Sequence, residues 1–82
     1  MKKAIGGLIF DTDSATVLAR SGDGNVLYQT PNGRYFECTH STLLAPEITI
    51  LTEDEAMFTY NRFSEKLVDF KLAFPDIEFR EA

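Results

Sequence analysis

The sequence of 82 residues is poor in the residues that define several protein classes, with one cysteine, one histidine and no tryptophan. A single cysteine, Cys38, excludes an intramolecular disulfide and gives no sign of an oxidising compartment. No apolar run approaches the ~20 residues of a membrane-spanning helix, and the short run 4–10 lacks the small-residue cleavage site of a signal peptide. We therefore expect one cytoplasmic domain, residues 1–82, without a membrane association.

Basic residues are also scarce, with 8 Lys and Arg against 13 Asp and Glu and a net charge of −5. Residues 1–46 carry equal numbers of acidic and basic side chains, so the whole net charge lies in residues 47–82. Nucleic-acid affinity depends on Lys and Arg that neutralise phosphates, so this acidic half disfavours direct nucleic-acid binding. An acidic half fits a basic protein surface, and it also fits a simple role in solubility.

Short apolar stretches separated by turn residues predict a small antiparallel sheet of four to six short strands. Pro31-Asn32-Gly33 is typical of a tight hairpin turn, because proline fixes φ and glycine accepts a left-handed conformation. Gly6 and Gly7 interrupt the first expected strand and predict a weak point or a bulge in it. The expected strands are residues 3–10, 16–21, 25–30, 34–40, 47–51 and a last edge strand at 77–80.

The strongest local signal begins at Thr52, which forms a capping-box pattern with Glu55 three residues later. Apolar residues then recur at intervals of three and four, and Pro75 ends the pattern. The residues of this stripe are Ala56, Tyr60, Phe63, Leu67, Phe70 and Phe74. The sequence thus predicts an α+β fold in which the sheet packs against one long helix, at about residues 53–74.

The residues that could carry out chemistry are few. Cys38 and His40 lie two apart on an expected strand, so both could reach one ion or one substrate. A zinc site needs three or four ligands and a nucleophile needs a base with an orienting group, and no further partner is indicated. Asp11 and Asp13 resemble a carboxylate pair, but the neighbouring Thr12 indicates a structural turn. We therefore expect no metal, no cofactor and no catalytic activity.

A second group of apolar residues lies away from the main stripe of the expected helix. At about 100° per residue, Met57, Phe58, Val68 and Leu72 point away from it, where a helix on a sheet should be polar. Acidic residues surround this group, namely Glu53, Asp54, Glu65 and Asp69. An apolar patch with a charged rim is typical of a protein-binding surface, while a homodimer interface and a wider buried face are the alternatives.

Three stretches together resemble a group of small proteins carried by phages and other mobile elements. They are GLIFDTDSA at residues 7–15, LYQTPNGRYF at 27–36 and LTEDEA at 51–56. Some proteins of this group are anti-CRISPR inhibitors, which bind a bacterial surveillance complex and block DNA recognition or cleavage. The resemblance implies a small sheet plus a helix, and an acidic surface that occupies a basic DNA-binding channel. Its acidic residues would be Glu53, Asp54, Glu55, Glu65, Asp69, Asp76 and Glu78.

The resulting hypothesis is a stoichiometric inhibitor that binds a Cas effector in the cytoplasm of a bacterial host. The alternative is a small homo-oligomeric module with a structural or regulatory role and no CRISPR connection. The expected partner-binding residues are Glu53, Asp54, Glu55, Met57, Phe58, Glu65, Asp69, Leu72, Asp76 and Glu78.

Overall fold

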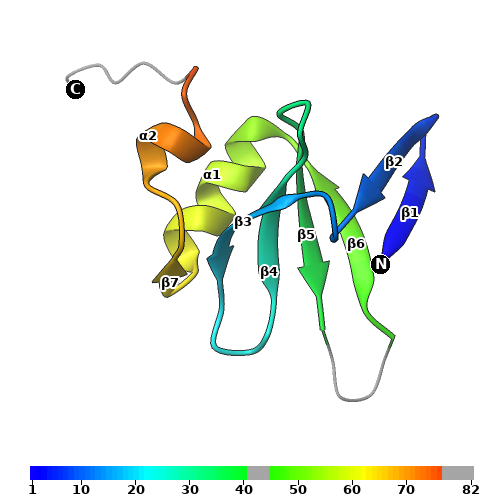
Figure 1. Ribbon diagram of the computed structural model, residues 1–82. Helices are drawn as coiled ribbons and strands as arrows, with labels where there is room; N and C mark the ends of the chain where they lie inside the picture. The colour runs from blue at the N-terminus through cyan, green and yellow to red at the C-terminus, as the bar shows by residue number, and fades with distance from the viewer. Residues whose placement is uncertain (41–44, 77–82) are drawn as a thin grey trace.

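In the part of the chain that the structure describes, five strands form one antiparallel sheet, and two more form a hairpin beside it (Figure 1). The computed structural model describes residues 1–40 and 45–76 and confirms the α+β class. The elements are β1 Lys2–Ile5, β2 Leu8–Asp11, β3 Thr16–Arg20, β4 Val26–Gln29, β5 Tyr35–Thr39, β6 Glu47–Leu51, α1 Glu53–Arg62, β7 Glu65–Lys66 and α2 Phe70–Ala73. The larger sheet has the order β6-β5-β4-β3-β7, so consecutive strands from β3 to β6 are neighbours.

The hairpin of β4 and β5 confirms the prediction made from its turn residues. Gly33 has a φ of 84°, the left-handed region that glycine accepts without steric cost. The backbone N–H of Gly33 donates to the Thr30 carbonyl at 2.9 Å, and the N–H of Thr30 donates to the Arg34 carbonyl at 2.8 Å. These local bonds close the turn and set the register of the two strands, with Tyr28 opposite Phe36.

The prediction of one strand over residues 3–10 is wrong, because these residues form the β1–β2 hairpin. Gly6 and Gly7 have φ values of 57° and 78°, and a two-residue type I′ loop needs positive φ at both central positions. The two glycines therefore reverse the chain, and Ile5 lies opposite Leu8. At the β1 side, the Lys3 ammonium donates to the Ile48 carbonyl of β6 at 3.4 Å.

The predicted capping box at the start of α1 is confirmed. The Glu55 N–H donates to the Thr52 hydroxyl at 3.2 Å, and the Thr52 N–H donates to the Glu55 carboxylate at 3.0 Å. Each side chain thus satisfies a backbone group that has no partner within the helix. Hydrogen bonds from Thr52 to the Glu55 carboxylate, that of the backbone N–H first and that of the side chain second, lower the pKa of the Glu55 carboxyl below its usual range.

Replacing Thr52 by alanine should lower the free energy of unfolding by about 1 kcal/mol, since the N-cap acceptor is lost. Urea denaturation measures the change, and Thr52→Ser is the matched control because it keeps the hydroxyl. The pKa of the Glu55 carboxyl is lower in the folded state than in the unfolded chain. Its hydrogen bonds therefore add stability at pH values above the pKa that Glu55 has in the unfolded chain. This added stability is lost as the pH falls through the pKa that Glu55 has in the folded state. Equal stabilities of the alanine and serine variants would contradict a role for this cap.

The prediction of one helix over residues 53–74 is wrong in length, since α1 ends at Arg62 and Phe63 is extended, with φ −76° and ψ 137°. A helix of 22 residues would be ~33 Å long, about twice the ~17 Å span of a five-residue strand, so much of its apolar stripe would find no sheet to cover. The chain instead pairs β7 with the edge of β3 and then turns back into α2. The backbone N–H of Leu67 donates to the Leu18 carbonyl at 3.0 Å, which holds the segment after β7 against β3.

Two small cores lie on the two faces of the larger sheet, because neighbouring residues of β5 point to opposite faces. The helix-side core consists of Leu18, Ala19, Leu27, Tyr35, Ala56, Tyr60, Phe63, Ala73 and Phe74. The hairpin-side core consists of Phe10, Phe36, Cys38 and Ile48. Tyr35 and Phe36 are therefore both buried, each on its own face, and the second core was not predicted.

Most of the predicted stripe does reach the helix-side core, although its residues come from α1, from α2 and from the residue that follows each helix rather than from one helix. Phe74 packs edge-on against the Tyr60 ring with centroids 5.7 Å apart and stacks on Tyr35 at 5.0 Å. The Tyr35 hydroxyl donates to the Ala73 carbonyl at 2.7 Å, which ties α2 to the sheet. Leu67 is the exception and is exposed. The predicted strand at 77–80 lies outside the described residues.

Candidate functional site

The predicted partner-binding residues do not share one helical surface, because the helix ends at Arg62. The members that lie in α1 are Glu53, Asp54, Glu55, Met57 and Phe58. Glu65 lies in β7, Asp69 is the N-cap of α2, Leu72 lies within α2 and Asp76 follows it. Glu78 lies outside the described residues. The fold keeps together the part of the predicted site that lies on the exposed side of α1. This side carries Glu53, Asp54 and Phe58, and we call it the outward face of α1.

Phe58 dominates the outward face of α1. Its side chain is 69% exposed, while Ala56, Thr59 and Tyr60 of the same helix are buried toward the sheet. The Arg62 guanidinium, one helical turn later, lies 5.7 Å from the centre of the Phe58 ring and 5.6 Å from that of Phe63. Such a cation–π contact is attractive, at about 0.5–1 kcal/mol for an exposed pair. The helix thus presents an aromatic side chain to the solvent with a guanidinium beside it.

The acidic residues of α1 differ in how free they are to meet a partner. Glu53 and Asp54 are exposed in the first turn, where the helix dipole favours negative charge. Asp54 precedes Phe58 by one helical turn, so the two side chains lie on the same side of the helix. Glu55 is engaged in the capping box and so has a structural role in addition to its charge.

The four residues of the predicted second apolar group have separated into two pairs. Met57 and Val68 are partly buried and pack against the helix-side core, so the wider buried face accounts for them. Phe58 and Leu72 are exposed, and Leu72 has an exposed fraction of 71%. Phe58 and Leu72 are thus the members of this group that a partner could contact with most of their side-chain area.

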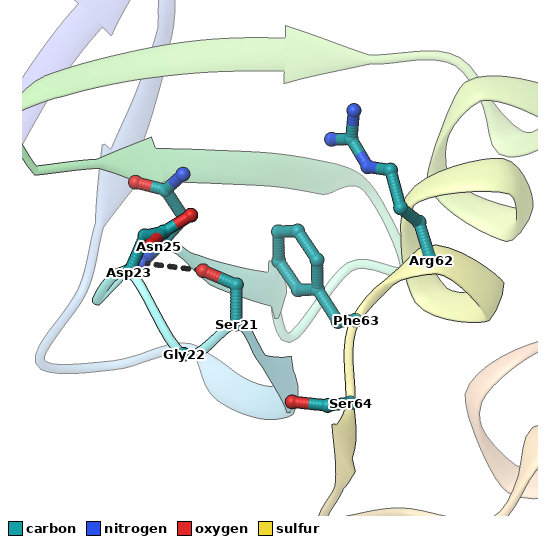
Figure 2. Close-up of a pocket in the computed structure, with 7 residues that line it drawn as sticks. All are labelled: Ser21, Gly22, Asp23, Asn25, Arg62, Phe63 and Ser64. Carbon is teal, nitrogen blue, oxygen red and sulfur yellow. Dashed lines mark hydrogen bonds between the residues drawn. The ribbon is translucent and has the colours of Figure 1, made fainter.

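A polar hollow of about 370 Å³ lies beside the C-terminal end of α1 (Figure 2). Its lining residues are Ser21, Gly22, Asp23, Asn25, Arg62, Phe63 and Ser64. The Ser21 hydroxyl accepts the backbone N–H of Asn25 at 3.1 Å, and the Asn25 side-chain carbonyl accepts the N–H of His40 at 2.9 Å. These bonds hold the turn between β3 and β4, so the side chains of Ser21 and Asn25 have a structural role in the hollow.

Cys38 and His40 lie in different environments, one buried and one exposed. Cys38 is buried in the hairpin-side core, and this burial raises the pKa of its thiol, which favours the protonated and unreactive form. His40 is exposed beyond the end of β5. Within residues 1–40 and 45–76, no group of three or more His, Cys, Asp or Glu residues has the arrangement of a metal site. Burial of Cys38 therefore disfavours the thiolate that a nucleophile or a metal ligand at this position would need.

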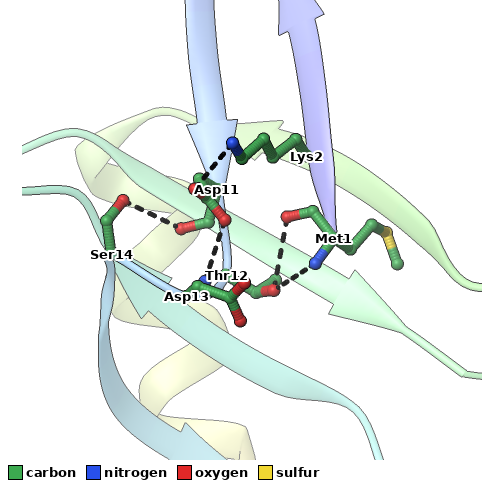
Figure 3. A network of polar contacts seen from close by, with 6 residues as sticks. All are labelled: Met1, Lys2, Asp11, Thr12, Asp13 and Ser14. Atoms are coloured by element: carbon green, nitrogen blue, oxygen red, sulfur yellow. Dashed lines mark hydrogen bonds and ion pairs between the residues drawn. The ribbon is translucent and has the colours of Figure 1, made fainter.

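Asp11 and Asp13 form a structural turn between β2 and β3 (Figure 3). The Asp11 carboxylate accepts the backbone N–H of Asp13 at 3.0 Å and lies 4.0 Å from the Lys2 ammonium. The N-terminal ammonium of Met1 donates to the Thr12 hydroxyl at 2.8 Å. These contacts secure the open end of the β1–β2 hairpin, as turn residues with short polar side chains do.

A second exposed apolar area lies on and beside β2, and the sequence analysis did not identify it. Leu8, Ile9 and Ile50 are all exposed there, and Ile9 has an exposed fraction of 71%. The available signal was the Gly6-Gly7 pair between two apolar runs, which predicts a hairpin with an exposed outer face. The prediction of one continuous strand over residues 3–10 assigns these apolar residues to a sheet interior, so it does not predict that they are exposed.

Comparison of the chain with protein-family models, with curated proteins and with solved structures found no match. In the part of the chain that the structure describes, no helix has both the length and the apolar character needed to cross a bilayer. The functional argument therefore depends on the surfaces described above.

Proposed function

We propose that the protein is a stoichiometric inhibitor that binds a partner protein through the outward face of α1 in the cytoplasm of a bacterial host. The observation that supports this most is Phe58, an exposed aromatic side chain on a helix whose first turn is acidic. Aromatic residues are enriched among the side chains that contribute most to interface affinity, and a polar rim usually surrounds them. The resemblance to anti-CRISPR inhibitors makes a Cas effector the first partner to test.

The proposed mechanism is the occupation of a basic surface that the effector needs for DNA. Glu53 and Asp54 would attract Lys and Arg side chains of the effector. Phe58 would enter an apolar pocket of the effector that lies between those basic side chains. Complementary charge accelerates encounter and selects the partner, while the buried aromatic side chain contributes more of the affinity. The protein itself would make no contact with nucleic acid. One copy bound to one surface is sufficient, and no chemical step is needed.

The test is capture of purified effector complexes by the tagged protein at low and moderate salt. A saturable complex with one effector, together with inhibition of its DNA binding or cleavage, would support the proposal. Failure to bind any effector in the set would count against the Cas assignment. Light scattering of the protein alone, run in parallel, shows whether it binds itself instead.

Reversing the charge of Asp54 should slow association with the captured partner by several-fold at low salt and weaken its salt dependence. The matched control is Asp13→Lys, which makes the same change in net charge in the turn between β2 and β3. Association rates from surface plasmon resonance at three salt concentrations distinguish the two variants. If both slow association equally, net charge rather than the α1 face determines the rate.

A homo-oligomeric module is the second candidate, and the exposure of both Phe58 and Leu72 favours it. A large apolar side chain on a surface helix can be covered by a second copy as well as by another protein. A dimer that persists on dilution and loses mass in Phe58→Asp would establish this reading. A monomer at all concentrations would eliminate it.

A further inference from the structure

Two adjoining hollows flank β2 at the end of the molecule where the β1–β2 hairpin tip and the β4–β5 turn both lie (Figure 1). The first has a volume of about 350 Å³ and is lined by Gly7, Leu8, Ile9, Phe10, Thr30, Pro31, Asn32 and Arg34. The second has a volume of about 380 Å³ and is lined by Leu8, Phe10, Gly33, Arg34, Tyr35, Ile50, Leu51 and Glu53. We call the two together the β2 trough. Such volumes are within the ~300–1,000 Å³ of ligand pockets.

The wall that β2 contributes to the first hollow is its backbone edge. Side chains of successive strand residues point to opposite faces, yet the four consecutive residues 7–10 all line this hollow. No residue of β1 lines either hollow, so the hollows lie on the side of β2 that faces away from β1. The opposite wall is the rigid β4–β5 turn, which its hydrogen bonds hold in place.

Among residues 1–40 and 45–76, no strand pairs with the edge of β2 that faces away from β1, where the backbone groups of Ile9 lie. Ile5 and Leu8 close the two-residue loop and form a hydrogen-bonded pair, and such pairs alternate with non-hydrogen-bonded pairs along an antiparallel ladder. Ala4 and Ile9 therefore form a non-hydrogen-bonded pair, so the Ile9 N–H and C=O point away from β1. An exposed strand edge of this kind is a template for a further strand.

The side chains of the trough indicate what that strand should carry. Leu8, Phe10, Ile50 and Leu51 provide apolar walls between β2 and β6. Arg34 lines both hollows and is exposed, and among the described residues no carboxylate lies within 4.0 Å of its guanidinium. A guanidinium binds a carboxylate with two parallel hydrogen bonds, so it favours an acidic side chain beside an apolar one.

We propose that the β2 trough binds an extended peptide segment of a partner protein, which adds to β2 as a strand. Its backbone pairs with the N–H and C=O of Ile9, one apolar side chain occupies the hollow beside Phe10, and a neighbouring Asp or Glu meets Arg34. This site adjoins the outward face of α1 at Glu53, which lines the second hollow, but it does not involve Phe58 or Asp54 and does not depend on the function proposed for that face. It gives the protein a second surface for a different class of partner.

The probes are three peptides, acetyl-Thr-Val-X-Val-Asp-Thr-amide, in which X is Val, Leu or Phe. Each is titrated into the full-length ¹⁵N-labelled protein and followed by amide chemical shifts. We expect the largest shifts at residues 7–10 and 30–34, with saturation by at least one peptide. The same spectra report that every variant used below is folded.

Two comparisons test the two parts of the recognition. Arg34→Gln should weaken binding about tenfold, because a charge-assisted hydrogen bond is lost, whereas Arg20→Gln, a change of an exposed arginine in β3, should leave binding unchanged. N-methylation of alternate amides of the best peptide should abolish binding in one of the two methylated registers, because one set of amides pairs with β2.

Each of three outcomes would overturn the proposal. The first is the absence of shifts at residues 7–10 with all three peptides at millimolar concentration. The second is equal binding by both N-methylated registers, since an edge pairing cannot tolerate both. The third is a shift of the same residues on raising the protein concentration without peptide, which would make a second copy the occupant. Loss of effector binding in Phe58 variants has no bearing on these outcomes.

Discussion

Replacing Phe36 by alanine is expected to destabilise the protein by about 3–5 kcal/mol, a large part of the ~5–15 kcal/mol that stabilises a typical small domain. Phe36 has no solvent exposure and lies at the centre of the hairpin-side core. Its ring stacks on Tyr28 with centroids 4.9 Å apart and meets Phe10 edge-on at 5.7 Å. Truncation would remove contacts with both β4 and β2 and leave a cavity beneath the hairpin.

Urea denaturation measures this loss, and Phe58→Ala is its matched control. The same residue type is removed there from a position that is 69% exposed, so the expected loss is below about 1 kcal/mol and consists mainly of the contact with Arg62. Hydrogen exchange of the β1 and β2 amides should rise in the Phe36 variant. Similar stabilities for the two variants would mean that the hairpin does not form a core with the sheet.

Replacing Phe58 by serine is expected to weaken binding of the partner by at least ~30-fold, the effect of losing an interface residue worth about 2 kcal/mol or more. The physical reason is that an aromatic side chain buried at an interface removes a large apolar area from water, and serine removes almost none. The effect should appear mainly as faster dissociation, because charge rather than apolar contact governs association. Calorimetry and surface plasmon resonance measure the two quantities.

The matched control for this variant is Ile9→Ser, which removes a similarly exposed apolar side chain from the opposite side of the sheet. Its affinity for the same partner should equal that of the unchanged protein. Both variants should keep nearly the full stability, so any loss of binding reports on contact rather than on unfolding. If Ile9→Ser weakened binding and Phe58→Ser did not, the partner would bind the hairpin side and not the α1 face.

The parts of the fold that the sequence predicts well are those that a few neighbouring residues determine. Thr52 and Glu55 determine the start of α1 through two bonds between themselves, whatever the rest of the chain does. Gly33 determines the β4–β5 turn through one backbone angle. In both places the local preference and the global fold agree, which is the usual condition of a reliable prediction.

The errors arise where a distant element competes with a local pattern. The apolar spacing from Ala56 to Phe74 satisfies a helical period, but pairing with the β3 edge ends the helix after Arg62. Periodicity indicates which residues become buried, and it does not indicate whether one long helix or two short helices carry them. The first hairpin was missed for a related reason, since Gly6 and Gly7 fit a bulge and a turn equally well when the fold around them is unknown.

The candidate site was predicted in part, and its two halves show why. Phe58 was identified because a large apolar residue on the polar side of a helix has no local explanation, and its exposure agrees with that reasoning. The exposure of Leu72 also agrees, although the break after Arg62 places it on another element. The packing of Met57 against the core and the open edge of β2 depend on contacts with distant residues, and no local spacing encodes those contacts.

The larger sheet ends in the two-residue strand β7 on one side and in β6 on the other, and the two ends resist further strand pairing in different ways, which bears on aggregation. The edge of β3 is covered by β7 through the pairs Ala19–Lys66 and Arg20–Glu65. At the other end, the Lys3 ammonium donates to the Ile48 carbonyl of β6, and this bond must be broken before another strand can pair with that carbonyl. Lysines placed on sheet edges are one way in which natural proteins prevent growth into ordered fibres. Strand addition from solution is thereby discouraged at both ends of the larger sheet and directed toward the hairpin.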